Sequence, residues 1–371
     1  EFRSPRARSA AGHAPPSALL FAARETPPMP SSPSTNVVLR RRGVRHGRFA
    51  YTLPTLPAER VQRELWAQDR ALHLPGILAR SLPRFRAQTR RSLALFDAVR
   101  SQKTVFQDEV RRRLRARAEF FPSGSVVDEN DVREIEKVYV DGMRGKRFAA
   151  RGLYAKLSWI AYDERDESLR IRFSFGSEKL LDWQKETRRA PWANRYAEAL
   201  FPECAALAEN RALRAVIERR IARRARLCER IIYNNAPGGG ALFHHDCEPA
   251  QRGVIFGQLA GETAWLALPK RELARHLTLF AKTPRLKRLA GTPAKALRAL
   301  DGDDERLYAI LNESPAFTAH LVAHGAFFHL RAGDALLLPN HGWDDTCWHS
   351  VFALGERPSL AHSYGIFAAR R

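Results

Sequence analysis

Residues 233–246 read Tyr-Asn-Asn-Ala-Pro-Gly-Gly-Gly-Ala-Leu-Phe-His-His-Asp, and they are the most informative stretch of this 371-residue chain. Pro237 and the three glycines that follow it predict a turn. If residues 242–246 are extended, successive side chains point to opposite faces, so His244 and Asp246 share one face and His245 points to the other. An imidazole and a carboxylate would then converge.

A second feature lies about a hundred residues further along the chain. Residues 330–339 (Leu-Arg-Ala-Gly-Asp-Ala-Leu-Leu-Leu-Pro) predict a strand after a Gly-Asp turn, and Cys347 begins another strand. There His349 shares its face with Cys347 and Val351, so we expect it to point inward.

Two histidines and one aspartate that leave neighbouring positions open form the triad that suits a non-haem Fe(II) oxygenase, whereas zinc usually prefers a closed tetrahedron. An H-x-D triplet alone is a weak signal among twelve histidines, and a structural or surface pair is the alternative interpretation. Further on, Arg357 and Ser359 are expected to share one face of the final strand. An arginine fork facing a metal cavity can hold a carboxylate in bidentate fashion.

Taken in order, Tyr, Pro-Gly-Gly, His-x-Asp, Gly-Asp-x-Leu-x-x-Pro, His-x-Val and Arg-x-Ser resemble the Fe(II)- and 2-oxoglutarate-dependent dioxygenases over about residues 230–367. The resemblance implies an α+β fold with a double-stranded β-helix (jelly roll, cupin-like) core. It implies that the iron ligands are His244, Asp246 and His349. It implies that the distal carboxylate of the cosubstrate 2-oxoglutarate is held by Arg357, Ser359 and Tyr233. O2 is the co-reactant, and the expected outcome is hydroxylation with release of succinate and CO2.

Residues 256–269 are also similar to the jumonji-type branch, in which a lysine near the position of Thr263 would bind the cosubstrate. That lysine is missing, so we expect Arg357 to be the anchor and do not expect a histone demethylase. The substrate class that we expect is a small molecule or a peptide or protein.

The chain divides into three predicted parts. Residues 1–36 are rich in Arg, Ser, Pro and Ala and predict a disordered basic tail, with an organelle transit peptide or a start at Met29 as alternatives. Residues 37–226 predict a supporting region, with helices over about 58–121 and 196–226 and a strand hairpin at 153–162 and 169–175. Residues 227–371 predict the core, interrupted by a helical insertion at 270–324.

The charge is strongly positive, with 62 Lys and Arg against 40 Asp and Glu, a net charge of +22. Such a balance suggests contact with a polyanion through basic helices, such as the run at 111–117. A solvated helix face is the interpretation we prefer, because no aromatic residues interleave for base stacking. Two alternatives stay open: a nucleic-acid-modifying dioxygenase, and a non-enzymatic cupin-like protein that binds nucleic acid.

The remaining composition bounds the setting. The four cysteines form no CxxC pair, which disfavours a disulfide scaffold and predicts a reducing, cytoplasmic environment. The mean hydropathy is -0.40, and no run of about 18 apolar residues occurs that would predict a membrane span. Neither the substrate nor the oligomeric state follows from the sequence.

Overall fold

A computed structural model describes residues 35–101, 105–114, 118–122, 133–140, 142–143, 146–147, 153–161, 163–175, 190–302 and 304–369. The predicted tail at 1–36 lies outside these residues, except that Thr35 and Asn36 begin the first strand. Within the described chain, no helix is long and apolar enough to cross a membrane.

Helices are mixed with antiparallel sheets, and the largest sheet has nine strands. Its order is β3 (Leu72–Leu74), β14 (Ala335–Pro339), β11 (Gln251–Ala260), β16 (Ser359–Ala368), β10 (Ala225–Asn235), β9 (Leu169–Phe175), β8 (Leu153–Trp159), β5 (Arg133–Val140) and β4 (Ala118–Pro122). A smaller sheet has the order β13 (Phe327–Arg331), β12 (Glu262–Pro269) and β15 (Cys347–Leu354). Two further pairs are β1 (Thr35–Arg41) with β2 (Val44–Tyr51), and β6 (Gly142–Met143) with β7 (Lys146–Arg147). The predicted boundary between residues 226 and 227 falls inside β10. Because β10 pairs with β9, the large sheet contains strands from both sides of that boundary.

One hydrophobic cluster joins the large sheet to the small one. Phe256 of β11 packs on Trp265 of β12 with ring centroids 4.5 Å apart, and Leu336 and Val351 belong to the same buried cluster. The alternation of apolar side chains along these strands therefore fills the space between the two sheets.

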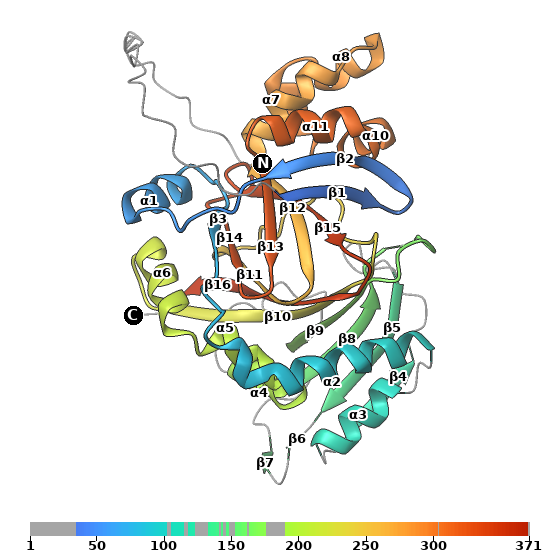
Figure 1. Cartoon of the computed structure of the whole chain (residues 1–371), viewed down its shortest axis with the longest axis vertical. Coiled ribbons are helices and arrows are strands. Elements are labelled where there is room, and N and C mark those ends of the chain that lie inside the picture. The colour runs from blue at the N-terminus through green and yellow to red at the C-terminus, as the bar shows by residue number, and fades with distance from the viewer. Residues whose placement is uncertain are drawn as a thin grey trace, which may run out of the picture.

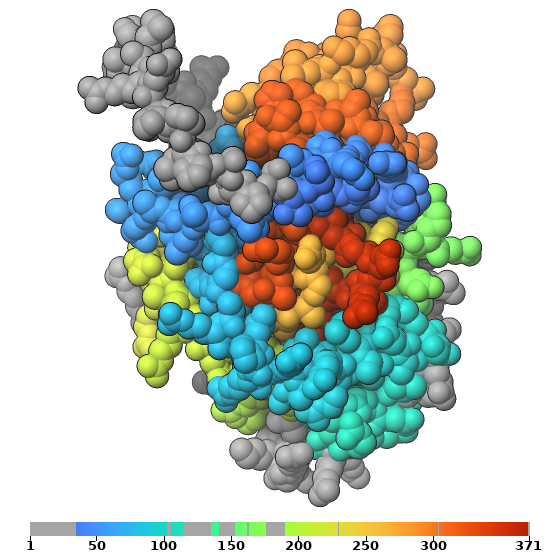
Figure 2. Space-filling model, viewed as in Figure 1, coloured from blue at the N-terminus to red at the C-terminus, as the bar shows by residue number. Residues whose placement is uncertain are grey.

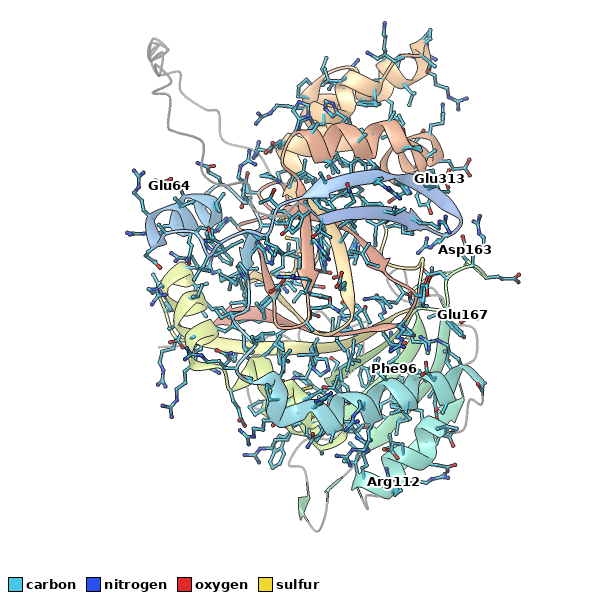
Figure 3. The ribbon with its side chains drawn as sticks, in the orientation of Figure 1. Glu64, Phe96, Arg112, Asp163, Glu167 and Glu313 are labelled. Atoms are coloured by element: carbon cyan, nitrogen blue, oxygen red, sulfur yellow. The ribbon has the colours of Figure 1, made fainter. Side chains whose placement is uncertain are left out.

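The other half of the large sheet is covered by helices α2 (Leu82–Ser101), α3 (Val105–Leu114) and α4 (Ala190–Leu200), as Figure 1 shows. Along β9, Leu169, Ile171 and Phe173 are buried in the cluster under these helices, whereas Arg170 and Arg172 point to the opposite face. Phe96 of α2 is fully buried and stacks on Phe201, and Figure 3 shows it on the sheet side of that helix. The predicted hairpin at 153–162 and 169–175 is thus confirmed as the antiparallel pair β8 and β9.

Residues 270–323, within the predicted insertion, form five helices, which cover the outer face of the small sheet together with β1 and β2. They are α7 (Lys270–Phe280), α8 (Pro284–Ala290), α9 (Pro293–Ala299), α10 (Glu305–Glu313) and α11 (Pro315–Ala323). The side chains of Thr283, Thr292, Asp304 and Ser314 accept hydrogen bonds from the first backbone N–H groups of the last four. These caps explain why so short a stretch can hold four separate helices.

The continuous helix predicted from Tyr196 to Arg226 is wrong. After α4 the chain forms a 3-10 turn η2 (Pro202–Cys204), the short α5 (Ala205–Ala208) and α6 (Arg211–Ile221), and β10 already begins at Ala225. Pro202 has no backbone N–H to continue the hydrogen bonding of α4, and it begins η2. Asn210 caps α6 by accepting a hydrogen bond from the N–H of Leu213. The helices predicted over 58–121 are present as α1 (Glu59–Ala67), α2 and α3, but β3 and β4 interrupt and end them.

Arg41, at the end of β1, ties several parts of the chain together. Its guanidinium is 2% exposed and donates to the carbonyl of Ala241 at 2.7 Å, to Ser350 Oγ and to the carbonyl of Asn312 at 3.1 Å. Burial lowers the pKa of Arg41 to about 9. In Figure 2, β1 and β2 in dark blue and α2 in cyan lie on either side of a band of C-terminal residues in orange and red.

Candidate metal centre

The glycine-rich turn before the predicted ligands allows an unusually close approach of two backbones. The carbonyl of Gly239 accepts from the N–H of Ala353 at 2.9 Å, and the carbonyl of Ala241 accepts from the N–H of Val351 at 2.8 Å. Gly240 has a φ of +128°, and a Cβ there would lie 2.3 Å from the carbonyl oxygen of Val351. A side chain at this position would therefore push the segment away from β15.

This pairing aligns the two predicted histidines. His244 and His349 form an isolated antiparallel bridge, exchanging N–H to carbonyl hydrogen bonds of 3.0 and 2.9 Å. Their ring centroids are 4.2 Å apart. Directly opposed residues of an antiparallel pair place their side chains on the same face, so the local backbone alone brings the two imidazoles together.

Asp246 completes the cluster. Its carboxylate oxygens lie 3.7 Å from Nε2 of His244 and 3.5 Å from Nε2 of His349. One donor atom from each of the three residues lies within 4.8 Å of the other two, which is a spacing that a metal ion can bridge. The structure thus brings together the three residues that the sequence analysis singled out as ligands.

The imidazole of His244 has a fixed orientation. Its Nδ1 lies 2.7 Å from the carbonyl oxygen of Leu242. Because a carbonyl only accepts, Nδ1 carries the proton and Nε2 presents its lone pair toward Asp246. Metal-binding histidines commonly have such a partner on the nitrogen that does not bind the metal.

Exposure and charge differ among the three side chains. His349 is 3% exposed, whereas His244 and Asp246 keep 42% and 37% of their side-chain surface accessible. Burial, followed by the charge of His244, lowers the pKa of His349 to about 3. Burial raises the pKa of Asp246, but His349 and His244 more than offset this and lower it below its usual range. At neutral pH a neutral imidazole and an ionised carboxylate are therefore available as ligands.

His245 points away from this cluster, as the alternation predicts. Its ring packs against Trp343 and Trp348, with centroids 4.8 and 5.2 Å away, and its Nδ1 accepts from the N–H of Cys247. A histidine adjacent to the cluster in sequence is thus separated from it in space.

Tyr233 lies on β10 near the cluster. Burial and the charge of Asp246 raise the pKa of Tyr233 to about 12. The ring centroid of Tyr233 is 5.9 Å from that of Phe256, and Phe256 packs on Trp265. The ring of Trp265 in turn stacks on that of His349, with centroids 5.4 Å apart. Aromatic rings thus fill the space between the sheets beside His349.

The structure does not bring Arg357 to the metal cluster. Arg357 is exposed in the turn between β15 and β16, ahead of the first residue of β16. Ser359 is fully buried at the start of β16, where its hydroxyl accepts from the side-chain amide of Asn235 at 3.3 Å. In the position of the jumonji lysine, Thr263 bonds to Gln258 at 2.9 Å and to the indole N–H of Trp265 at 3.0 Å.

A different arginine has its charge near the cluster. Arg170 on β9 lies directly across from Tyr233 on β10, and its charge contributes to lowering the pKa of Asp246 and partly offsets the rise in the pKa of Tyr233. Its Nε donates to Ser158 Oγ at 3.3 Å. The sequence analysis predicted the strand that carries Arg170 but overlooked this role. The signal was the alternation Leu169-Arg170-Ile171-Arg172-Phe173, which places two cations on the face opposite the buried apolar residues.

The described part of the basic run, at the end of α3, has carboxylate partners on its own helix. Arg112 and Arg113 both bind Glu109 on α3, and Arg111 lies 3.8 Å from Asp108. Figure 3 shows Arg112 at the outer edge of the molecule. Residues 115–117 of the predicted basic run lie outside the described residues. Contact with a polyanion stays a prediction, and the local ion pairs favour the solvated-face interpretation.

Comparisons with known proteins add little to this geometry. No protein-family model and no curated protein matches the chain. Among solved structures, the Escherichia coli ribosomal oxygenase YcfD is similar at 14% identity and a TM-score of 0.25, over 68% of this chain and 40% of that chain. The present chain thus spans less than half of the length of that protein.

Proposed function

We propose that the chain is an Fe(II)- and 2-oxoglutarate-dependent oxygenase that hydroxylates a small-molecule or peptide or protein substrate. The observation that carries the proposal is the convergence of His244, Asp246 and His349 at the junction of the two sheets. Two imidazoles and one carboxylate on a shared face fit a divalent iron that keeps further positions for other ligands. Iron bound there would supply the activation of O2, with 2-oxoglutarate converted to succinate and CO2.

The strand order supports a double-stranded β-helix for this core. From β10 onward the chain passes repeatedly between the two sheets. The large sheet takes β10, β11, β14 and β16, and the small sheet takes residues 239–244, β12, β13 and β15. Residues 239–244 count with the small sheet because they bond along β15. We propose that these segments form the jelly-roll core and that the helices around them support it.

We propose Arg170 together with Tyr233 as the holder of the distal carboxylate of 2-oxoglutarate. Both side chains lie on the face of the large sheet nearest Asp246, and a guanidinium with a phenol can give a carboxylate charge-assisted hydrogen bonds. Arg357 and Ser359 are the holders that the resemblance implied, but Arg357 is exposed and Ser359 is engaged by Asn235. The two assignments predict different effects of Arg170→Ala and Arg357→Ala on the binding of 2-oxoglutarate.

The role of the chain's own residues follows from their placement. His349, buried beside Trp265, would give the ion a fixed ligand, whereas His244 and Asp246 lie on the accessible side. A substrate would therefore approach from the side of His244 and Asp246. Aromatic rings behind His349 exclude water from the other side.

The decisive experiment is an anaerobic titration of the full chain with Fe(II) and 2-oxoglutarate, followed by the visible metal-to-ligand charge-transfer band. Wild type should give the band, and His349→Ala should lose it. His245→Ala is the matched control, because that histidine points away from the cluster, and it should keep the band. Absence of the band in wild type at saturating cosubstrate would reject the proposal.

The same titration separates the two candidate anchors. If Arg170 holds the carboxylate, Arg170→Ala needs at least tenfold more 2-oxoglutarate for half of the band, an estimate on the order of one lost charged hydrogen bond. Arg357→Ala should then behave as wild type. The reverse result would return the anchor to Arg357.

A further inference from the structure

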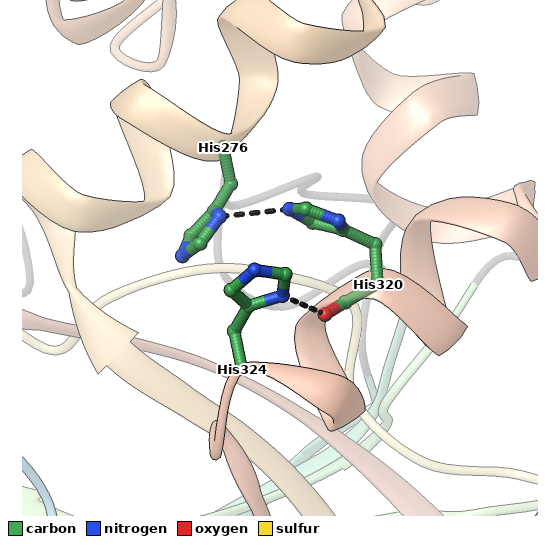
Figure 4. A group of neighbouring side chains, drawn as sticks. All are labelled: His276, His320 and His324. Atoms are coloured by element: carbon green, nitrogen blue, oxygen red, sulfur yellow. Dashed lines mark hydrogen bonds between the residues drawn. The ribbon is translucent and has the colours of Figure 1, made fainter.

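Three histidines gather at a second place, between helices of the insertion (Figure 4). His276 lies on α7, His320 on α11, and His324 immediately follows α11. His276 and His320 are 44 residues apart in sequence. None of the three contributes to the cluster of His244, Asp246 and His349, which lies across the small sheet from the insertion.

The three rings surround a common point. Nδ1 of His276 is 2.9 Å from Nε2 of His320. The ring centroids are 4.9, 5.1 and 4.1 Å apart for the pairs His276–His320, His276–His324 and His320–His324. One ring nitrogen from each residue lies within 4.8 Å of the others. Two imidazoles bound to one zinc ion are about 3.4 Å apart at their nitrogens, from metal distances of about 2.05 Å, so small side-chain rotations would suffice.

The orientation of His324 is already that of a metal ligand. Its Nδ1 lies 2.7 Å from the carbonyl oxygen of His320, so Nδ1 donates and Nε2 carries the lone pair. Figure 4 shows the ring of His324 between the other two, with its second nitrogen on their side. A hydrogen bond from the non-binding nitrogen to a backbone carbonyl is the usual device that fixes a metal-binding imidazole.

His276 has a comparable partner in a carboxylate. Its Nε2 lies 3.7 Å from Oε1 of Glu272, one turn earlier on α7, so Nδ1 is the nitrogen that faces His320. The other oxygen of Glu272 binds Arg70 at 2.6 Å, which holds the carboxylate in place. Arg275 is a cation close to His276, and Glu272 offsets its charge. This is the carboxylate–histidine–metal arrangement in which the outer carboxylate raises the basicity of the ligand.

We propose that His276, His320 and His324 form a second metal site, which takes a borderline divalent ion such as Zn²⁺ with a water molecule as the fourth ligand. Three imidazoles without a carboxylate ligand favour zinc, nickel or copper over iron or magnesium. His324 is exposed, so an ion can reach the site from solvent. Because the ligands come from both α7 and α11, the ion would tie the first helix of the insertion to the last.

The test uses the full chain, purified without a histidine tag, in a His349→Ala background that disables the first cluster. Co²⁺ is the probe, because tetrahedral Co²⁺ absorbs strongly in the visible whereas octahedral Co²⁺ does not. The proposal expects one tetrahedral Co²⁺ per chain, displaced by Zn²⁺. His276→Ala, His320→Ala and His324→Ala should each weaken binding at least tenfold, on the order of the loss of a ligand or its support.

His341→Ala is the matched control, because His341 binds Asp69 outside both clusters and its loss should leave Co²⁺ binding unchanged. A second readout is the melting temperature, which Zn²⁺ should raise in the parent but not in His324→Ala. A faint octahedral spectrum would overturn the proposal. Co²⁺ binding that His324→Ala leaves unchanged, or an equal Zn²⁺ shift in both proteins, would also overturn it.

Discussion

The two histidine clusters are built by opposite means. In the first, His244 and His349 face each other across one antiparallel bridge, and Asp246 follows on the same chain segment. In the second, His320 and His324 share one face of a helix end, and His276 comes from another helix. A strand pair positions its ligands by backbone hydrogen bonds, whereas a helix pair positions them by side-chain packing. The first cluster should therefore depend on the backbone of 239–244, and the second on single side chains.

The largest difference should appear when a ligand of the first cluster is removed. His349→Ala should lower the Fe(II) affinity of the full chain by a hundredfold or more, on the order of a lost ligand in a three-residue set. The Co²⁺ site on the insertion should not change. Anaerobic equilibrium dialysis measures the Fe(II) affinity and the tetrahedral Co²⁺ absorption reports the site on the insertion, and a loss of that absorption in His349→Ala would show that the two clusters are coupled.

The backbone dependence of the first cluster can be tested at Gly240. In Gly240→Ala the new Cβ would meet the carbonyl of Val351, so we expect a loss of about 2–4 kcal/mol in unfolding free energy and weaker Fe(II) binding. Gly238→Ala is the matched control. Gly238 also has a positive φ, of +70°, but a Cβ there meets nothing within 4 Å, so the loss should be about 1 kcal/mol. Urea unfolding compares them, and equal losses would contradict the close-approach argument.

His362, a buried histidine outside both clusters, provides a reference for them. Burial, followed by the charge of Arg230, lowers the pKa of His362 on β16 to about 3. Below the unfolded value of about 6.5 the unfolded chain binds a proton that the folded chain does not, so stability falls with pH from there toward about 3.

Between pH 7 and pH 5 this loss should be about 2 kcal/mol, and His362→Gln should remove most of it. Urea unfolding at both pH values measures the difference. Ser363→Ala, at the next position of the same strand, is a control that should keep the pH dependence of wild type. Burial also lowers the pKa of His349 and His46, so part of the pH dependence of wild type should remain in His362→Gln, and a dependence as large as that of wild type would assign the titration to another group.

The smallest effect concerns the outer support of the second cluster. Glu272→Gln should weaken Co²⁺ binding about tenfold, because it removes the negative charge behind His276 while keeping the size of the side chain. Glu313→Gln changes a carboxylate at the end of α10 and should leave Co²⁺ affinity as it is. Titration with Co²⁺ in the His349→Ala background compares the two variants, and equal Co²⁺ affinities would show that Glu272 does not support the site.

The contrast also explains what the sequence could predict. His244 and Asp246 are two positions apart, so the period of a strand is enough to place them on one face, and His349 lies on a strand that a Gly-Asp turn announces. His276 and His320 are close only because five helices fold back on the small sheet, and no local period reports that. Their distance in the chain hid the second cluster.

The other predictions also succeeded where a local pattern was enough and failed where it was not. The hairpin at β8 and β9 followed from alternation, whereas the long helix at 196–226 failed because apolar periodicity continues through Pro202 and past Ala222 into β10. Arg357 was assigned because the Arg-x-Ser pattern was expected to lie on one face of the final strand, but Arg357 lies in the turn before that strand and is exposed. Arg170 could not be placed beside Tyr233 from the sequence, because their proximity comes from the pairing of β9 with β10, a contact between segments about 60 residues apart.

The contacts of Arg41 bear on the order in which the protein can assemble during synthesis. The bonds of this side chain to Ser350 and Ala241 join the beginning of the described chain to its last strands across 309 and 200 residues. A ribosome releases Arg41 long before it has translated Ser350, so β1 can pair with β2 early, whereas the guanidinium of Arg41 stays hydrated until its distant partners emerge. Closing so long a loop costs entropy before any contact repays it. The first cluster should therefore mature only after the ribosome has released β15, which carries His349.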